Sequence, residues 1–131
     1  MKLQPIGHVE SPLTDRSAAP KQPDEGAPEA ALVFAPEYAR AMRELSPGQD
    51  VLVLTWLDRA DRSVLAVHPR SDPDRAETGV FSTRSPDRPN PIGLHHVRIT
   101  SVEGLNVRVA HLEAIDGTPI VDVKPVLGPE R

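Results

Sequence analysis

The chain of 131 residues contains no cysteine, which excludes disulfides, thiol catalysis and cysteine-ligated metal sites. Only 3% of its residues are aromatic, too few for a surface that binds single-stranded nucleic acid by stacking many bases. No apolar run approaches the roughly 18 residues of a membrane span, and the N-terminus lacks the apolar core of a signal peptide. These absences favour a cytoplasmic globular protein.

Metal and phosphate sites are also disfavoured. His95 and His96 are adjacent, so on a strand they point to opposite faces and cannot chelate one ion together. His8 and His68 have no partner at zinc-ligand spacing. There is no glycine-rich phosphate loop, and we therefore predict neither a metal site nor a nucleotide site of the P-loop kind.

Size and charge limit the class of partner. The length suits one domain with a real core, and 38% hydrophobic with 26% charged residues is ordinary for a globular protein. The net charge of −4 is unusual for a nucleic-acid-binding protein. Composition by itself therefore points away from RNA.

The element pattern is mainly β. Strands are predicted at 5–10, 31–34, 51–57, 63–68, 94–102, 105–112 and 120–124. The apolar run 51–57 predicts a central strand buried on both faces. Strands without regular strand–helix alternation indicate a mainly β fold and favour a barrel with long loops, the longest at 11–30.

One short helix is expected after Pro36. Tyr38, Ala41, Met42 and Leu45 recur at i, i+3, i+4 and i+7, the spacing of an amphipathic α-helix. Proline is favoured in the first turn of a helix. We therefore predict a helix that packs this stripe onto the barrel.

Residues 79–93 (GVFSTRSPDRPNPIG) are the most distinctive stretch. The pattern begins as a strand, and the prolines then stiffen a loop that carries Arg84, Ser85, Arg88 and Asn90. Rigid guanidinium and amide groups suit an anionic or hydrogen-bonding ligand. The alternative is a proline-stiffened turn with solvated arginines, and the residues alone leave both interpretations open.

This stretch resembles the signature of the TrmO (YaeB or TsaA-like) family. Residues 5–12 (PIGHVESP), 19–23 (APKQP) and 116–125 (DGTPIVDVKP) resemble further family motifs in the same order. The resemblance implies a homodimeric single-sheet β-barrel that binds S-adenosylmethionine and methylates N6 of N6-threonylcarbamoyladenosine in tRNA. Several members of the family carry a C-terminal accessory domain, and from the length of this chain we expect residues 1–131 to form one barrel domain without it.

By aligned position, the resemblance implies a set of ligand contacts. The implied cofactor contacts are Pro23, Asp24, Glu25, Asp58, Arg59, Arg84, Leu94, Ala110, His111, Leu112 and Glu113. Arg88 and Asn90 on the stiff loop are implied substrate contacts. The Asp58–Arg59 pair departs from the His–Gln type expected of the family.

The catalytic candidates lie near the C-terminus. Asp122 and Lys124 are two apart on a predicted strand, so both side chains leave one face. They form either a structural ion pair or a catalytic pair in which Lys124 orients Asp122 as a general base. Asp116 begins a glycine-containing turn and is a weaker candidate, because aspartate is favoured there for local hydrogen bonding.

Three functions follow. The first is tRNA methylation. The acidic charge, the expected lack of an accessory domain and Val126 at a position where the family often has tyrosine favour a second, methylation of a small molecule in the same cofactor pocket. The third is a non-catalytic module that senses the cofactor.

Overall fold

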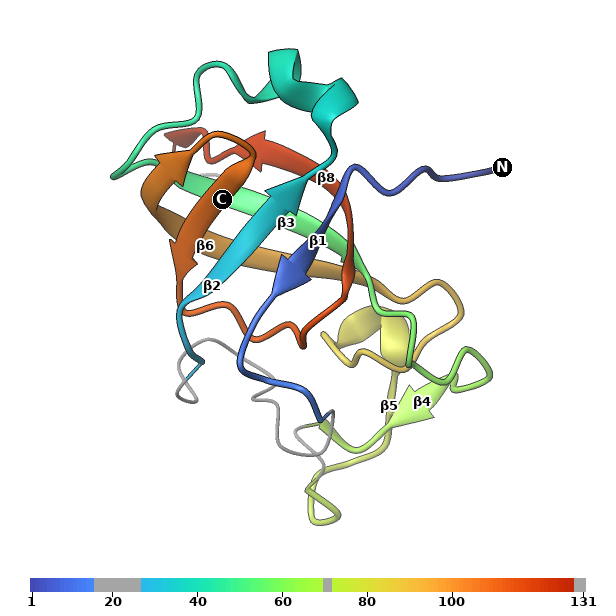
Figure 1. Ribbon diagram of the computed structural model, residues 1–131. Coiled ribbons are helices and arrows are strands. Elements are labelled where there is room, and N and C mark those ends of the chain that lie inside the picture. Colours follow the sequence, from blue (N-terminus) through green and yellow to red (C-terminus); the bar gives the residue numbers. More distant parts are fainter. Residues whose placement is uncertain (16–26, 70–71, 129–131) are drawn as a thin grey trace.

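The computed structural model describes residues 1–15, 27–69 and 72–128. Six antiparallel strands form one sheet that closes on itself as a barrel in the order β1-β2-β7-β6-β3-β8 (Figure 1). The barrel strands are β1 Gly7–Glu10, β2 Ala30–Phe34, β3 Asp50–Trp56, β6 Ile92–Glu103, β7 Asn106–Ala110 and β8 Pro119–Pro125. The predicted mainly β, barrel-like fold is thereby confirmed.

Burial alternates along the barrel strands, and this corrects the prediction for residues 51–57. On β3 the residues alternate between the interior (Val51, Val53, Thr55, all fully buried) and the outside (Leu52, Leu54, Trp56, all partly exposed). The prediction of burial on both faces is wrong because a barrel of this size covers only the inner face of its wall. The outward apolar side chains remain available to another surface.

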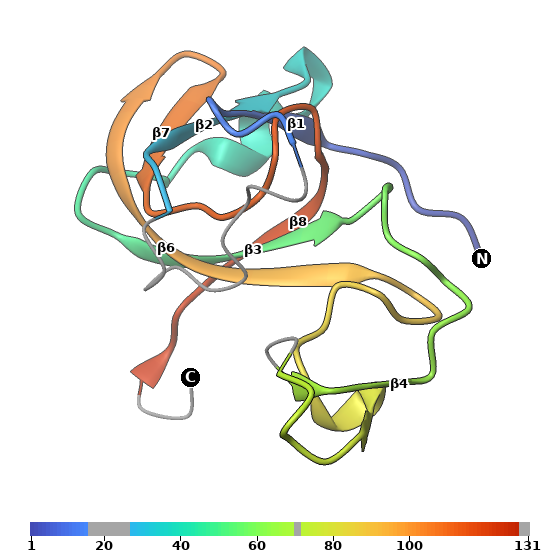
Figure 2. The same cartoon turned by 90° about the horizontal axis from the view of Figure 1, so that it is seen from below.

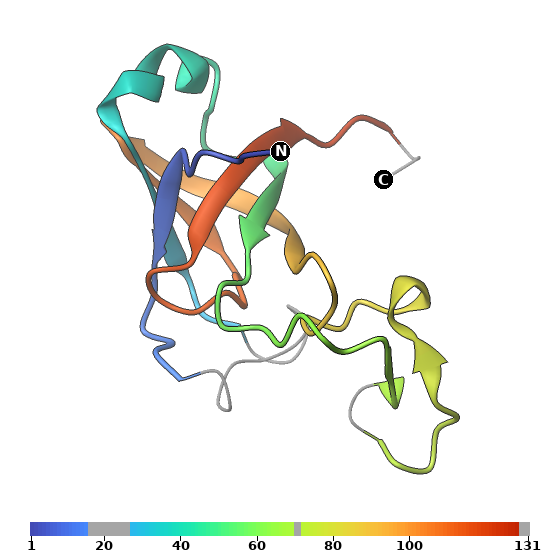
Figure 3. The same cartoon turned by 90° about the vertical axis from the view of Figure 1, so that its right-hand side faces the viewer.

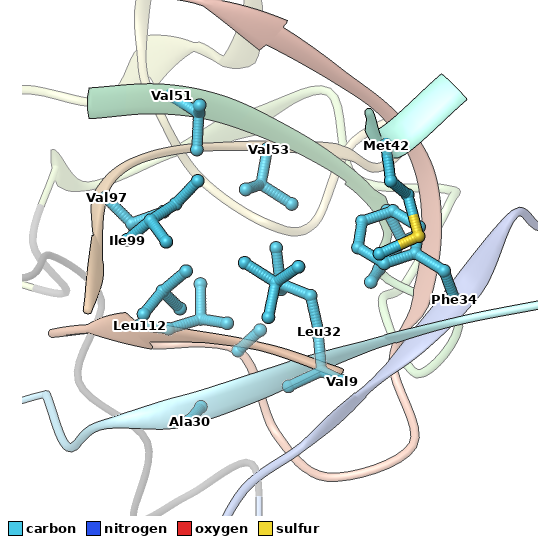
Figure 4. Packing of buried hydrophobic residues seen from close by; sticks show 14 residues of the cluster. Val9, Ala30, Leu32, Phe34, Met42, Val51, Val53, Val97, Ile99 and Leu112 are labelled. Atoms are coloured by element: carbon cyan, nitrogen blue, oxygen red, sulfur yellow. The ribbon is translucent and has the colours of Figure 1, made fainter. Parts of the chain in front are cut away.

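The interior is filled by aliphatic side chains from all six strands. Figure 4 shows Leu32, Val53, Ile99 and Leu112 pointing toward one another, and each is at most 1% exposed. A small barrel has an interior just wide enough for its own side chains. Polar groups that act on a ligand must therefore lie at an end of the barrel or on its outer wall.

The expected helix is present but is a 3-10 helix, η3 Pro36–Met42. Met42 is buried beside Phe34 (Figure 4), Leu45 is partly buried against the same core, and Ala41 is exposed. A 3-10 helix has three residues per turn, so the predicted stripe is only partly kept. Met42 anchors η3 over one end of the barrel.

The predicted strands at 63–68 and 79–84 are largely wrong. Only β4 Ala66–Val67 and β5 Thr78–Gly79 pair, as a small two-stranded sheet that projects beside the barrel (Figure 3). The chain then forms a 3-10 turn, η5 Val80–Ser82, in which Val80 is buried and Phe81 is 84% exposed. An isolated pair of strands is only marginally stable and has no third strand to extend it.

The antiparallel order gathers the chemistry-bearing loops at one end of the barrel. β3 ends there at Trp56, β6 begins at Ile92 and β7 ends at Ala110. We call this the loop end; η3 lies at the opposite end (Figures 1 and 2). No helix among the described residues has the length and apolar character needed to cross a bilayer.

Candidate functional site

Three buried polar side chains form a hydrogen-bonded chain at the loop end. The Thr55 hydroxyl lies 2.7 Å from Nε2 of His95, and Nδ1 of His95 lies 2.5 Å from Oε1 of Glu113. Thr55 is fully buried, and the side chains of His95 and Glu113 are 5% and 10% exposed. With His95 neutral, Nδ1–H donates to the carboxylate and Nε2 accepts from the hydroxyl.

One carboxylate oxygen of Glu113 is left without a hydrogen bond in the described part of the chain. Its Oε2 is buried and has no hydrogen-bond partner among the described residues. A buried carboxylate oxygen without a partner is costly and rare, and it points to a missing donor. Glu113 is one of the cofactor contacts implied by the resemblance, and Oε2 is the atom free to make that contact.

The sequence interpretation missed Thr55 and His95, although one signal was available. His95 falls on the inward side of the period-2 pattern of β6, and the structure confirms that it is buried whereas His96 is exposed. A histidine on an inward face requires a polar partner. No local signal could have identified Thr55, which looks like an ordinary β-former within an apolar run.

A left-handed residue turns the chain toward this network. His111 has φ of 59°, and its ring Nδ1–H donates to the carbonyl of Ala27 at 3.2 Å. The next residue, Leu112, is fully buried in the core, and its N–H donates to the Pro28 carbonyl at 2.9 Å. Of the implied contacts at 110–113, Leu112 therefore presents no exposed side chain, whereas His111 is exposed.

The two arginines of the signature loop are placed differently. Arg88 turns back into the loop and donates to the carbonyls of Thr83 and Ser85, both at 3.1 Å, and to that of Val80. Arg84 is exposed and has no hydrogen-bond or ion-pair partner in the described parts of the chain. Arg88 thus braces the loop, and Arg84 is the cation that the loop displays.

Arg62, which the sequence did not single out, braces the other half of the loop. Its Nε donates to the Pro89 carbonyl at 2.7 Å and its Nη2 to Oδ1 of Asn90 at 2.9 Å. Its guanidinium also lies 5.2 Å from the centre of the Trp56 ring, a cation–π geometry. The contact with Asn90 occupies the amide oxygen and leaves the amide N–H groups for a ligand.

A groove of about 390 Å³ lies beside this brace. Its lining is mainly apolar and comprises Met1, Leu3, Pro5, Trp56, Arg62, Asn90, Ile92, Pro119 and Val121. Of the predicted site residues that the structure describes, only Asn90 lines it. An indole, an amide and apolar side chains suit a planar organic group rather than a phosphate.

The catalytic candidates Asp122 and Lys124 lie on the outer wall. Nζ of Lys124 is 3.0 Å from Oδ2 of Asp122, and the two side chains are 60% and 45% exposed. Leu54 pairs with Asp122 on one side and with Leu94 on the other, which puts these three side chains in one outward row. The wall therefore separates this pair from Glu113 inside the loop end.

The same outer wall ends in a charged cluster. Asp50 accepts from Nε of Arg98 at 2.8 Å and lies 3.3 Å from Nε2 of His96. The hydrogen bond from Arg98, followed by that from His96, lowers the pKa of Asp50 below its ordinary value. This cluster is solvent-exposed and adds no further group to the loop end.

The remaining predicted residues either make contacts with nearby loops or lie outside the described residues. Oδ1 of Asp116 accepts the Ser11 N–H at 3.0 Å, and Nη1 of Arg59 donates to the Thr14 carbonyl at 3.2 Å. Asp58 is exposed. The implied contacts Pro23, Asp24 and Glu25 lie outside the described residues. Within the described ranges, no three His, Asp or Glu side chains gather as a metal site would require.

The fold and the loop end define a small β-barrel with a buried polar network at one end. The family model for the tRNA-methyltransferase O N-terminal domain matches residues 8–128. The chain belongs to this family, and the resemblance drawn from its motifs is confirmed.

Individual relatives and solved structures agree with this family assignment. The chain is 42% identical over 125 residues to a probable S-adenosyl-L-methionine-binding protein of Methanothermobacter thermautotrophicus, covering 95% of this chain and 89% of that one. It is 40% identical to an S-adenosyl-L-methionine-binding protein of Archaeoglobus fulgidus, with 95% and 88% covered. A crystal structure of TrmO from Pseudomonas aeruginosa matches with a TM-score of 0.76 and 30% identity, over 97% of this chain. This chain spans 56% of that structure's length.

The different placement of the two arginines gives a first prediction. Arg88→Lys should loosen the signature loop, because one ammonium group cannot reproduce the planar fork that reaches three carbonyls. Hydrogen exchange of the amides at 80–90 should accelerate by about tenfold or more, because the free energy of local opening falls by roughly 1–3 kcal/mol when these hydrogen bonds are lost. Arg84→Lys is the matched control and should leave exchange unchanged; equal acceleration in both variants would contradict the assignment.

Proposed function

We propose that the chain is a cytoplasmic S-adenosylmethionine-dependent methyltransferase that holds this cofactor at the loop end, and that its acceptor is N6 of N6-threonylcarbamoyladenosine in tRNA. The observation that carries the proposal is the buried, unpartnered Oε2 of Glu113. The family and the names of the archaeal relatives support the cofactor assignment. The tRNA acceptor rests on the family description and on the signature loop.

The residues of the loop end fit this cofactor. S-adenosylmethionine carries a sulfonium, an ammonium, hydroxyl groups and a carboxylate, and when bound it supplies an activated methyl group with its own leaving group. Oε2 of Glu113 can accept from a hydroxyl or an ammonium group, or face a cation. The unpaired guanidinium of Arg84 can bind a carboxylate. The negative group of this ligand and one of its positive groups therefore each have a counterpart.

The protein's contribution to the transfer is chiefly positional. The reacting atoms must be held at about 3–3.5 Å and in line, which requires rigid supports. Arg62 and Arg88 stiffen the two halves of the signature loop through hydrogen bonds to its backbone and to Asn90. The free amide N–H groups of Asn90 can then fix the acceptor.

Asp122 is the proposed general base. An N6 amine conjugated to a carbamoyl group is a poor nucleophile, so removal of its proton assists transfer. Lys124 and the Val123 N–H each bind one oxygen of this carboxylate, at 3.0 and 2.9 Å, and fix its orientation. Because it lies on the outer wall, Asp122 can be reached from outside this chain, including from a site on a second copy that faces the wall.

Substitution of this carboxylate tests its role. Asp122→Asn should reduce the single-turnover rate of methyl transfer by about 10²–10⁴-fold, the usual contribution of a general base, with little change in cofactor affinity. Glu103→Gln, an exposed carboxylate at the far end of β6, is the matched control. An unchanged rate in Asp122→Asn would remove Asp122 from the mechanism.

The groove beside Trp56 supports a second candidate, a small-molecule acceptor. Its volume of about 390 Å³ and its mainly apolar lining suit a compact planar compound, and the chain carries a net charge of −4. Binding of tRNA is expected to weaken steeply with salt, because phosphate contacts release counterions. Binding of an uncharged small molecule is expected to be independent of salt.

Transfer of a labelled methyl group distinguishes the candidates. With labelled S-adenosylmethionine we expect incorporation into tRNA that carries N6-threonylcarbamoyladenosine and none into tRNA that lacks it. Label in small metabolites of a cell extract, with none in tRNA, would favour the small-molecule acceptor. Cofactor binding by calorimetry without transfer to any fraction would indicate a sensor.

We also propose a homodimer formed through the outer wall. Leu94 and Ile92 are 42% and 41% exposed, and partly exposed Leu54 lies between Leu94 and Asp122. A contiguous apolar face on a small domain is typical of an interaction surface. A second copy of the chain would cover this face and bring another loop end near it.

A charge placed in this face should dissociate the dimer. Leu54→Asp is expected to give a monomer at micromolar concentration by sedimentation velocity, because burying an unpaired carboxylate is costly. Thr100→Asp, also outward on β6 but outside the apolar row, should remain dimeric. A monomeric wild type, or a dimeric Leu54→Asp, would refute this interface.

A further inference from the structure

We propose that His95, fixed from behind by Thr55, is a positioning residue that holds the carboxylate of Glu113 so that Oε2 faces the ligand. The inference rests on the proposed function, because the ligand is taken to be S-adenosylmethionine. It adds two residues that no implied contact includes. Neither is expected to touch the ligand itself.

The geometry leaves the imidazole no freedom. Both ring nitrogens are engaged, Nε2 with Thr55 at 2.7 Å and Nδ1 with Glu113 at 2.5 Å. Rotation of the ring about its bond to Cβ would break both contacts inside a nearly dry site, where unmade hydrogen bonds are most costly. Glu113 follows β7 without belonging to a strand, so His95 supplies the restraint that the sheet does not.

The backbone makes room for this arrangement at one position. A Cβ at Gly93 would lie 2.3 Å from Oγ1 of Thr55 and 2.7 Å from Nε2 of His95. Gly93 pairs directly with Thr55 across β3 and β6 and precedes His95 by two residues on the same inward face. Any larger residue there would displace the Thr55–His95 contact.

The hydrogen bond from His95 determines which oxygen of Glu113 is left for the ligand. Nδ1–H of His95 donates to Oε1, which leaves Oε2 as the acceptor for a donor or cation on the ligand. Without that donor the carboxylate can rotate and present either oxygen. Loss of His95 should therefore weaken ligand binding through disorder of Glu113 rather than through loss of a direct contact.

Two substitutions of His95 separate positioning from a merely structural role. The amide nitrogen of asparagine can take the place of Nδ1 as a donor to Glu113. That of glutamine can reach the position of Nε2 and donate to the Thr55 hydroxyl, which can turn to accept. His95→Asn should keep the bond to Glu113 and bind S-adenosylmethionine within about threefold of wild type. His95→Gln should keep the bond to Thr55, lose the bond to Glu113 and bind about tenfold more weakly, the loss of one charge-assisted hydrogen bond.

The measurement is calorimetric titration of both variants, with their unfolding free energies measured in urea. A purely structural role predicts that affinity follows stability; the proposal predicts that affinity follows the bond to Glu113. His95→Gln combined with Glu113→Gln should bind no more weakly than Glu113→Gln alone. Equal affinities of His95→Asn and His95→Gln, or additive losses in the double variant, would overturn it.

Three ligands identify the group that meets Oε2. A tenfold loss for S-adenosylmethionine, S-adenosylhomocysteine and methylthioadenosine alike assigns the nucleoside; a loss for the first two only assigns the ammonium group; a loss for the first only assigns the sulfonium. If wild type binds none of the three, the proposed function fails and this inference fails with it. If wild type binds and the His95 variants do not differ, only this inference fails.

A glycine pair provides a second test without altering the polar groups. Gly93→Ala should weaken binding, because its methyl group displaces His95 or Thr55. Gly79→Ala, where an added Cβ meets nothing within 4 Å, is the control and should bind as wild type does. The ¹⁵N chemical shifts of His95 report the tautomer directly and should change in Gly93→Ala but not in Gly79→Ala; shifts that are unchanged in both variants would count against the proposal.

Discussion

Closure of the sheet between β1 and β8 is the constraint on which the rest of the structure depends. Gly7–Ile120 and His8–Pro119 pair across this seam. It is extended at one end by the bond from the Ile6 N–H to the Ile120 carbonyl at 2.9 Å and at the other by bonds of Val9 with Thr118 and Gly117 at 2.9 and 2.7 Å. Gly7 permits the close packing beside it, since an added Cβ would meet the Val33 carbonyl oxygen at 2.3 Å. Once the seam is closed, the interior is filled with side chains, and ligand chemistry is confined to the loop end and the outer wall.

The barrel strands were predictable because their inward residues are apolar at period two. Strands β1, β2, β6, β7 and β8 all lie close to the predicted ranges. The failures have one cause in common. Residues 51–57 and 79–84 carry apolar or β-forming side chains whose surroundings depend on elements far away in the chain, and local pattern cannot say whether a partner strand exists. Leu54 was expected to be buried by this chain and instead contributes to an open face.

The candidate site was predictable only where a feature depends on residues that are neighbours in the sequence. The prolines correctly indicated a loop, but the bonds that brace it depend on Arg62, 28 residues before Asn90, and on the inward turn of Arg88. No spacing rule links Arg62 to the loop, because tertiary structure alone brings them together. His95 and His96 were placed on opposite faces of a strand without either being assigned inward, and the partner of His95, Glu113, is 18 residues away and follows a left-handed turn at His111.

The separation of Glu113 from Asp122 has a consequence for the proposed catalysis. Glu113 lies inside the loop end, whereas Asp122 lies outside the wall, and a single copy of the chain does not bring their carboxylates to one point. A methyl group must nevertheless pass directly from donor to acceptor within about 3–3.5 Å. The amine that would lose its proton to Asp122 is also the atom that would receive the methyl group, so the length of the acceptor cannot bridge the two sites. A second chain whose outer wall covers the first chain's loop end would bring them together. The open row of Leu54 and Leu94 suits that arrangement, both for a tRNA loop and for a compact acceptor in the groove beside Trp56.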